Sequence, residues 1–229
     1  MEHEDHARPE AQSFEFLEYK DVQAHFADLN VELLRGGHIL NDKYYSFQLL
    51  RNYFPQLHHY YQSLYGLELI EESQGDTTYF YLDFSDESKG KHGDPSNYRN
   101  LPESQTVFGI TLLNLYYDRY FEHPKEITMS DLKREFLESE NSVLYRRLWF
   151  GEVRDDYSKK EWMPVIKSIN ATLRYFKQLG WIEAQQTEDD EDEEVKFVIK
   201  ESILRFQKLY EKEIAEFEAF VESYLAQKQ

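Results

Sequence analysis

The side chains best suited to chemistry in this sequence are cations gathered between residues 141 and 180. This segment holds eight Lys and Arg residues against four Asp and Glu residues, although the whole chain has a formal net charge of -18. Lys167, Asn170, Arg174 and Lys177 follow at steps of three, four and three, which places them on one helix face. Such a face predicts a sequence-independent contact with DNA phosphates; salt bridges with nearby acids are the alternative. The candidate DNA-binding residues are Arg146, Arg147, Lys159, Lys160, Lys167, Arg174 and Lys177.

The overall acidity limits the possible partners. A field of this sign repels phosphate backbones and anionic membranes at long range, so any contact with DNA must be local. Nowhere do 18 apolar residues follow one another, and the first residues are acidic rather than basic and apolar. We therefore expect a cytoplasmic protein with no membrane partner.

Residue types that support catalysis or metal binding are sparse. The chain has no cysteine, which excludes disulfides, thiolate nucleophiles and Cys-based zinc sites. The adjacent His58 and His59 point to different faces of a helix and cannot easily share a metal. The seven consecutive acids of residues 188–194 lack the ligand spacing of a calcium loop, and a solvated tip is favoured over a calcium or basic-partner site. No phosphate-binding or nucleophile motif is present, so we expect no catalytic residue, cofactor or metal.

Aromatic residues dominate a region that lacks positive charge. No Lys or Arg occurs between Arg51 and Lys89, so this region is better suited to binding protein than phosphate. A second candidate surface is an apolar stripe near the C-terminus, for which packing on the chain's own core is the alternative. The candidate residues for an interface with a partner protein or with a second copy of the chain are Tyr53, Phe54, Tyr60, Tyr61, Tyr65, Phe217, Val221 and Tyr224.

The elements that position these residues follow one order twice. Apolar spacing predicts a helix from Val22 to Gly36, an extended piece at residues 38–40, a helix capped by Asn41, and a third helix from Pro55 to Gly66. Residues 67–70 and 77–84 then read as a hairpin. This is the order of a winged helix.

The second half repeats the pattern after a polar linker. We expect a helix at residues 102–122, an extended piece at 127–129, a helix capped by Ser130, and a helix from a Ser158–Glu161 capping box to Gly180. Residues 181–184 and 195–200 would form a second wing, and residues 203–224 one closing helix with a single apolar stripe.

The predicted fold class is α+β and mainly helical, with two tandem winged-helix domains plus a C-terminal helix. The expected divisions are a flexible acidic tail (1–14), a first winged-helix domain (15–84), a linker (85–100), a second winged-helix domain (101–200) and the C-terminal helix (201–229).

Three segments resemble the MukE and MksE family of bacterial condensin subunits. They are residues 33–39 (LLRGGHI) with the Asn41 cap, residues 165–181 ending in LGW, and residues 196–206 (KFVIKESILRF). Together with the tandem helix-and-wing order, the resemblance covers roughly residues 20–210. It implies a homodimeric, non-enzymatic subunit that binds a kleisin of the MksF or MukF type and, through it, an SMC ATPase of the MksB or MukB type.

The resemblance further implies association with the nucleoid and a role in chromosome condensation and segregation or in plasmid restriction. The acidic run at residues 188–194 departs from the family pattern. The alternative is a winged-helix transcription regulator, which should carry basic residues on its recognition helix and wing together. Here one half has no such residues and the other has an acidic wing, which favours the condensin subunit.

Overall fold

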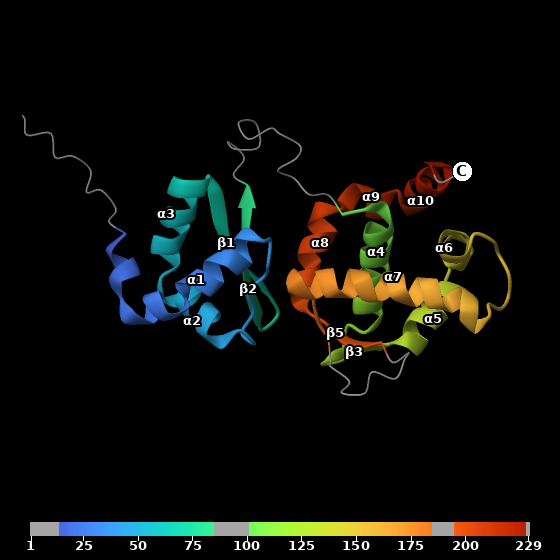
Figure 1. Cartoon of the computed structure of the whole chain (residues 1–229), viewed down its shortest axis with the longest axis horizontal. Helices are drawn as coiled ribbons and strands as arrows, with labels where there is room; N and C mark the ends of the chain where they lie inside the picture. The colour runs from blue at the N-terminus through green and yellow to red at the C-terminus, as the bar shows by residue number, and fades with distance from the viewer. Residues whose placement is uncertain (1–13, 85–100, 185–194, 228–229) are drawn as a thin grey trace, which may run out of the picture. The chain divides into compact units, whose positions relative to one another are not determined.

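The computed structural model describes residues 14–84, 101–184 and 195–227. The predicted tail, the linker at 85–100 and the acidic run at 188–194 lie outside these ranges, apart from the tail's last residue. The chain divides into two compact units, residues 1–99 and 100–229, and it is mainly helical with small antiparallel sheets (Figure 1). The α+β class is therefore confirmed.

The first unit packs three helices against one hairpin. Its core contains Leu29, Leu50, Tyr61 and Phe80, which are almost fully buried. The elements are the 3₁₀ helix η1 (Glu15–Glu18), α1 (Lys20–Leu34), α2 (Tyr44–Asn52), α3 (Phe54–Tyr65), β1 (Leu67–Gln74) and β2 (Thr77–Phe84).

The hairpin is longer than the sequence predicted, and a third short segment joins it. β1 continues to Gln74, which pairs with Thr77, so Gly75 and Asp76 alone make the turn; Gly75 has a φ of 56°. The backbone of Ile39 exchanges hydrogen bonds with Phe80, at 2.9 Å from Ile39 N to Phe80 O and 3.0 Å in return. The predicted extended piece at residues 38–40 is thereby confirmed.

The predicted cap at Asn41 is wrong. The N–H of Lys43 donates to the carbonyl of Leu40 at 3.1 Å, which closes a turn that contains Asn41. α2 begins only at Tyr44, and Lys43 precedes it with its ammonium paired to Glu32 of α1. Lys43 makes no side-chain cap hydrogen bond, and its ion pair instead ties the start of α2 to α1.

The second unit surrounds one buried helix. Val107, Phe108 and Leu112 of α4 are fully buried, and Gly109 leaves room for the ring of Phe206, which lies 2.5 Å from the position a Cβ would take. The strands form a sheet in the order β3-β5-β4. The elements are α4 (Glu103–Asp118), β3 (Lys125–Thr128), α5 (Met129–Glu138), α6 (Ser142–Phe150), α7 (Lys159–Gln178), β4 (Ile182–Ala184), β5 (Lys196–Ile199), the 3₁₀ helix η3 (Glu201–Ile203), α8 (Leu204–Leu209), α9 (Glu211–Ala215) and α10 (Phe217–Gln227).

Two expectations for the second unit need correction, and one helix was not predicted. α4 ends at Asp118 rather than near residue 122. α5 is capped by Thr128 rather than Ser130, because Asp131 and Thr128 form a capping box across the first turn. α6 was not predicted; it ends at Gly151, whose φ of 80° is the left-handed conformation of a helix C-terminus.

The prediction of a single closing helix at residues 203–224 is also wrong, because this part of the chain is broken into η3 and three short helices. Tyr210 and Glu216 leave the helical conformation, with φ and ψ of -119° and 31°, and -113° and 37°. The hydroxyl of Tyr210 accepts the N–H of Leu101 at 2.9 Å, and its ring stacks on Phe206. The apolar residues of the stripe pack against one core from these consecutive short helices.

Candidate functional site

Helix α7 carries the predicted cationic ridge, and its start is fixed by a capping box. The carboxylate of Glu161 accepts hydrogen bonds from Ser158 N at 2.8 Å and from Ser158 Oγ at 2.7 Å. The hydrogen bond from the Ser158 side chain, followed by the contact with Arg154, lowers the pKa of Glu161 to about 2. The cap predicted from Ser158 and Glu161 is therefore confirmed.

The inner face of α7 anchors the helix in the unit. Trp162, Val165, Ile169, Leu173 and Phe176 are buried, at the three- and four-residue spacing that faces a core. Figure 1 shows α7 crossing in front of α4, with α5 and α6 near its first turns. The core thus determines which face of α7 meets solvent.

The outer face of α7 is a continuous polar and cationic surface. Lys160, Lys167, Arg174 and Lys177 are all exposed, together with Asn170. Within residues 14–84, 101–184 and 195–227, none of these four cations forms an ion pair. We call these four residues and Asn170 the α7 ridge. Its side chains are directed outward by the helix.

The three remaining candidate cations have other surroundings. Arg147 forms two contacts with the carboxylate of Glu222 in α10, one of them at 3.0 Å from Nη2. Arg146 donates to the carbonyl of Leu137, and its guanidinium lies 4.0 Å from Asp155. Lys159 is exposed at the first residue of α7. Arg146 and Arg147 therefore hold α6 to its neighbours and are poorly placed for an external anion.

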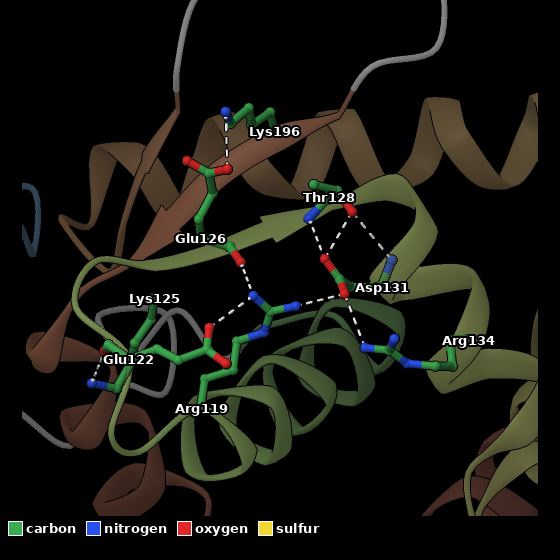
Figure 2. A network of polar contacts seen from close by, with 8 residues as sticks. All are labelled: Arg119, Glu122, Lys125, Glu126, Thr128, Asp131, Arg134 and Lys196. Carbon is green, nitrogen blue, oxygen red and sulfur yellow. Dashed lines mark hydrogen bonds and ion pairs between the residues drawn. The ribbon is translucent and has the colours of Figure 1, made fainter.

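A polar network fixes the elements beside the ridge. The guanidinium of Arg119, at the end of α4, lies 2.5 Å from Asp131, 2.5 Å from the Glu126 carbonyl and 3.1 Å from Glu122 (Figure 2). Asp131 also accepts from Thr128 N at 2.9 Å and from Arg134 at 2.9 Å. One carboxylate thereby joins α4, β3 and α5.

The electrostatics of Asp131 reflect this geometry. Partial burial alone would raise its pKa, but the hydrogen bonds from Thr128 and the positive charges of Arg119 and Arg134 outweigh burial and lower the pKa. The ionised carboxylate is therefore the stable form in the folded protein.

The aromatic candidates of the first unit divide into core and surface residues. Tyr61 is fully buried and Tyr60 nearly so, and burial, together with a hydrogen bond to Tyr65, raises the pKa of Tyr60 to about 12. Tyr53 and Phe54 are half-buried, while Tyr65 is 39% exposed. Tyr60 and Tyr61 thus serve core packing, and Tyr65 is the candidate most accessible to a partner.

The candidates near the C-terminus pack on their own unit. Val221 is fully buried, and Phe217 and Tyr224 pack against the same core; the ring of Phe217 lies 5.9 Å from that of Tyr145. The interface prediction for Val221 needs correction, since its side chain is inaccessible in this fold. Core packing, the alternative considered for this stripe, accounts for these contacts.

The sequence patterns did not identify the aromatic side chains that are most exposed among the described residues. Tyr44 and Tyr45 of α2 are each 63% exposed, and Phe121, between α4 and β3, is 92% exposed. The position of Tyr44 and Tyr45 depends on where α2 begins, which the wrong cap at Asn41 obscured. A signal for Phe121 was its place among polar residues just before Pro124, beyond the apolar period of α4.

The part of the chain that the structure describes contains neither a candidate metal site nor a candidate membrane span. No three or more His, Asp or Glu side chains gather there in a way that could hold a metal ion. No helix within the same ranges combines the length and apolar character needed to cross a bilayer.

Comparison with known proteins gives one family. A search of the curated proteins finds no match. The family model described as the condensin complex protein MksE matches residues 24–211, a range that includes α2, α3 and the hairpin of the first unit and α4 to α8 of the second. This chain therefore belongs to the MksE family of condensin complex proteins.

Proposed function

We propose that this protein is a non-enzymatic accessory subunit of a bacterial SMC complex of the condensin type. In this proposal it forms a homodimer, binds the kleisin subunit and reaches the SMC ATPase through that kleisin. It helps the complex to hold DNA, in chromosome condensation and segregation or in plasmid restriction, as a cytoplasmic protein associated with the nucleoid. Membership of the MksE family supports the complex, and the cations of the α7 ridge, which form no ion pair within the described residues, support the contact with DNA.

We assign both units to the winged-helix fold. In the first, α1, the extended piece at Ile39, α2, α3 and the β1-β2 hairpin follow the order of that fold. In the second, α4, β3, α5, α7 and the strands β4 and β5 repeat the order, with α6 inserted, and β3 pairs with β5. α7 then occupies the place of the helix that enters the major groove in DNA-binding members of this fold.

The ridge has dimensions that suit a duplex. At a rise of about 1.5 Å per residue, the 17 steps from Lys160 to Lys177 span about 25 Å of helix. Four cations on that length can neutralise up to about four phosphates, so the logarithm of the binding constant should fall with a slope of up to about -4 against the logarithm of salt concentration. The cations of the ridge can reach phosphates whatever the base sequence, so we propose contact with the phosphate backbone alone.

Exposed aromatics of the first unit are the proposed kleisin surface. Tyr44, Tyr45 and Tyr65 present large side chains to solvent, and the ring of His25 stacks on Tyr45 at 4.5 Å. Tyrosines of this kind bury large areas at little cost in side-chain entropy. We place the kleisin on this surface and the DNA on α7, so that two partners bind without competing.

A transcription regulator is the second candidate, because a cationic recognition helix is also what such a protein needs. A regulator recognises particular bases, which demands polar side chains directed at base edges and binding that differs strongly between sequences. The family match favours the condensin subunit.

The experiment that tests the proposal is light scattering after size exclusion, on the chain alone and co-expressed with the kleisin encoded beside it. We expect a dimer that elutes together with the kleisin. A chain that ignores the kleisin and shifts tightly on one promoter sequence would instead establish the regulator.

A further inference from the structure

The loop between α4 and β3 presents an unusual group of aromatic side chains. Phe121 is 92% exposed, whereas no other large apolar side chain in the described residues exceeds 63%. Tyr120 lies edge-on to it, with ring centroids 5.2 Å apart, and Tyr117 is also exposed. We call Tyr117, Tyr120 and Phe121 the aromatic knuckle. Because Phe121 is almost fully exposed, it contributes almost none of the stabilisation that burial of a phenylalanine would give.

The loop is fixed from both ends, so the exposure is built into the fold. Tyr120 N donates to Tyr117 O at 3.1 Å, and Glu122 N donates to Arg119 O at 3.0 Å. The guanidinium of Arg119 is held by Asp131 and by the carbonyl of Glu126 (Figure 2). Phe121 therefore stands between residues tied to α5 and β3.

A buried lysine closes the other side of the loop. The ammonium of Lys125 donates to the Glu122 carbonyl at 3.2 Å and lies 4.8 Å from the centroid of the Tyr116 ring. Both cations near the knuckle, Arg119 and Lys125, are thus engaged inside the unit. An aromatic side chain held in one arrangement loses little freedom on binding, which favours affinity.

The charges beside the knuckle identify the chemistry of its partner. Asp118 and Glu122 are exposed on either side of Tyr120, and no exposed Lys or Arg lies within residues 117–124. Carboxylates repel DNA phosphates and anionic lipid headgroups. A protein pocket with an apolar floor and basic side chains around its rim complements this surface, since aromatic anchors in such pockets supply much of the binding energy of protein interfaces.

We propose that the aromatic knuckle is a protein-docking site that inserts Phe121 into a basic-rimmed apolar pocket of another subunit of the condensin complex. The aromatic knuckle consists of other residues than the α7 ridge and the exposed tyrosines of the first unit, so it adds a third contact to the proposed function. It rests on family membership and does not depend on which surface binds DNA.

The test compares variants of the full chain for binding to the purified kleisin and to the purified SMC subunit, each by isothermal titration calorimetry. Phe121→Ala should weaken binding to one of the two at least ten-fold, while its melting temperature stays that of the wild type, because the side chain touches little. Asp118→Lys should weaken the same binding and make it less sensitive to salt. Leu209→Ala, an exposed apolar side chain of α8 in the same unit, is the matched control and should bind normally.

Three results would overturn this inference. Phe121→Ala binding both subunits with wild-type affinity would show that the knuckle docks on neither. A change from dimer to monomer would make a second copy of this chain the occupant, and a loss confined to DNA binding would make nucleic acid the occupant. Wild-type chain that binds neither subunit would contradict the proposed function as well, so the two failures are distinguishable.

Discussion

At the scale of single residues, Asp131 joins three elements. Its side chain is only 12% exposed and holds Arg119 at the end of α4, Arg134 of α5 and Thr128, which is the last residue of β3 and the cap of α5. Asp131→Asn keeps the shape but removes the closer of the two counter-charges of Arg119, and we expect a loss of about 1–3 kcal/mol of unfolding free energy in urea titrations. Asp118 is the exposed last residue of α4, and Asp118→Asn should change the free energy of unfolding by less than about 0.5 kcal/mol.

The pH dependence of this difference has a defined sign. Folding lowers the pKa of Asp131 below its ordinary value of 3.8. Its contribution is therefore complete above pH 3.8 and is lost as the pH falls through the lowered value. The stability gap between wild type and Asp131→Asn should stay constant from about pH 7 to 5 and shrink below about pH 3.8. A gap that widens in acid would contradict the assigned charge state.

Residue spacing predicted which side chains of α7 are exposed, but it did not predict which of the candidate cations form ion pairs. The steps of three and four residues correctly predicted that Lys167, Arg174 and Lys177 share an exposed face. That Arg147 pairs with Glu222 depends on a contact between residues 75 positions apart, which no local pattern encodes. For the same reason, composition could not separate the buried Tyr61 from the exposed Tyr65.

At the scale of elements, α7 contains a local conflict. Pro164 is the sixth residue of the helix; it has no N–H for the carbonyl of Lys160, and its ring crowds that carbonyl. Pro164 is exposed, so it contributes little packing. Pro164→Ala should therefore raise the melting temperature, by the equivalent of about 1–3 kcal/mol, in calorimetry. Asn170→Ala, at another exposed position of α7, should cause little change, and a lower melting temperature for Pro164→Ala would contradict a destabilising role of the proline.

Helices with strong end signals were predicted well and those defined by tertiary contacts were not. The Ser158 box and Gly180 bracket α7, and Pro55 and Gly66 bracket α3, as expected. α6 is nine residues long and is held by the buried Tyr145 and Leu148 and by the ion pair of Arg147 with Glu222 of α10. Tyr210 and Glu216 break the C-terminal segment without a local signal such as Gly or Pro. Periodicity carries information about a helix face, but not about where a core forces the chain to bend.

At the scale of the whole molecule, the protein combines strong acidity with one cationic face. A net charge of -18 opposes nonspecific association with nucleic acid, so binding depends on how close the α7 ridge is brought to the duplex. In the proposed function, the kleisin and the SMC subunit supply that proximity. The chain alone should therefore bind DNA weakly, and the assembled complex should bind it more tightly.

The three proposed surfaces should differ in how strongly salt weakens the binding of their partners. DNA binding through the ridge should fall steeply with salt, whereas kleisin binding through tyrosines should depend on it little. Docking of the aromatic knuckle, with Asp118 and Glu122 beside it, should lie between the two. Salt titrations on the assembled complex can thus separate the contributions.

The central claim is that the α7 ridge holds DNA within a condensin complex. The measurement that tests it most directly is the affinity of the assembled complex for a short duplex, by fluorescence anisotropy, with Lys167→Glu, Arg174→Glu and Lys177→Glu combined. The matched control reverses Arg35, Arg51 and Lys212, which are exposed off α7 and change the net charge equally. We expect at least a ten-fold loss of DNA affinity for the ridge variant alone, with kleisin binding intact. Equal DNA affinity in both variants, or loss of the kleisin from the ridge variant, would contradict it.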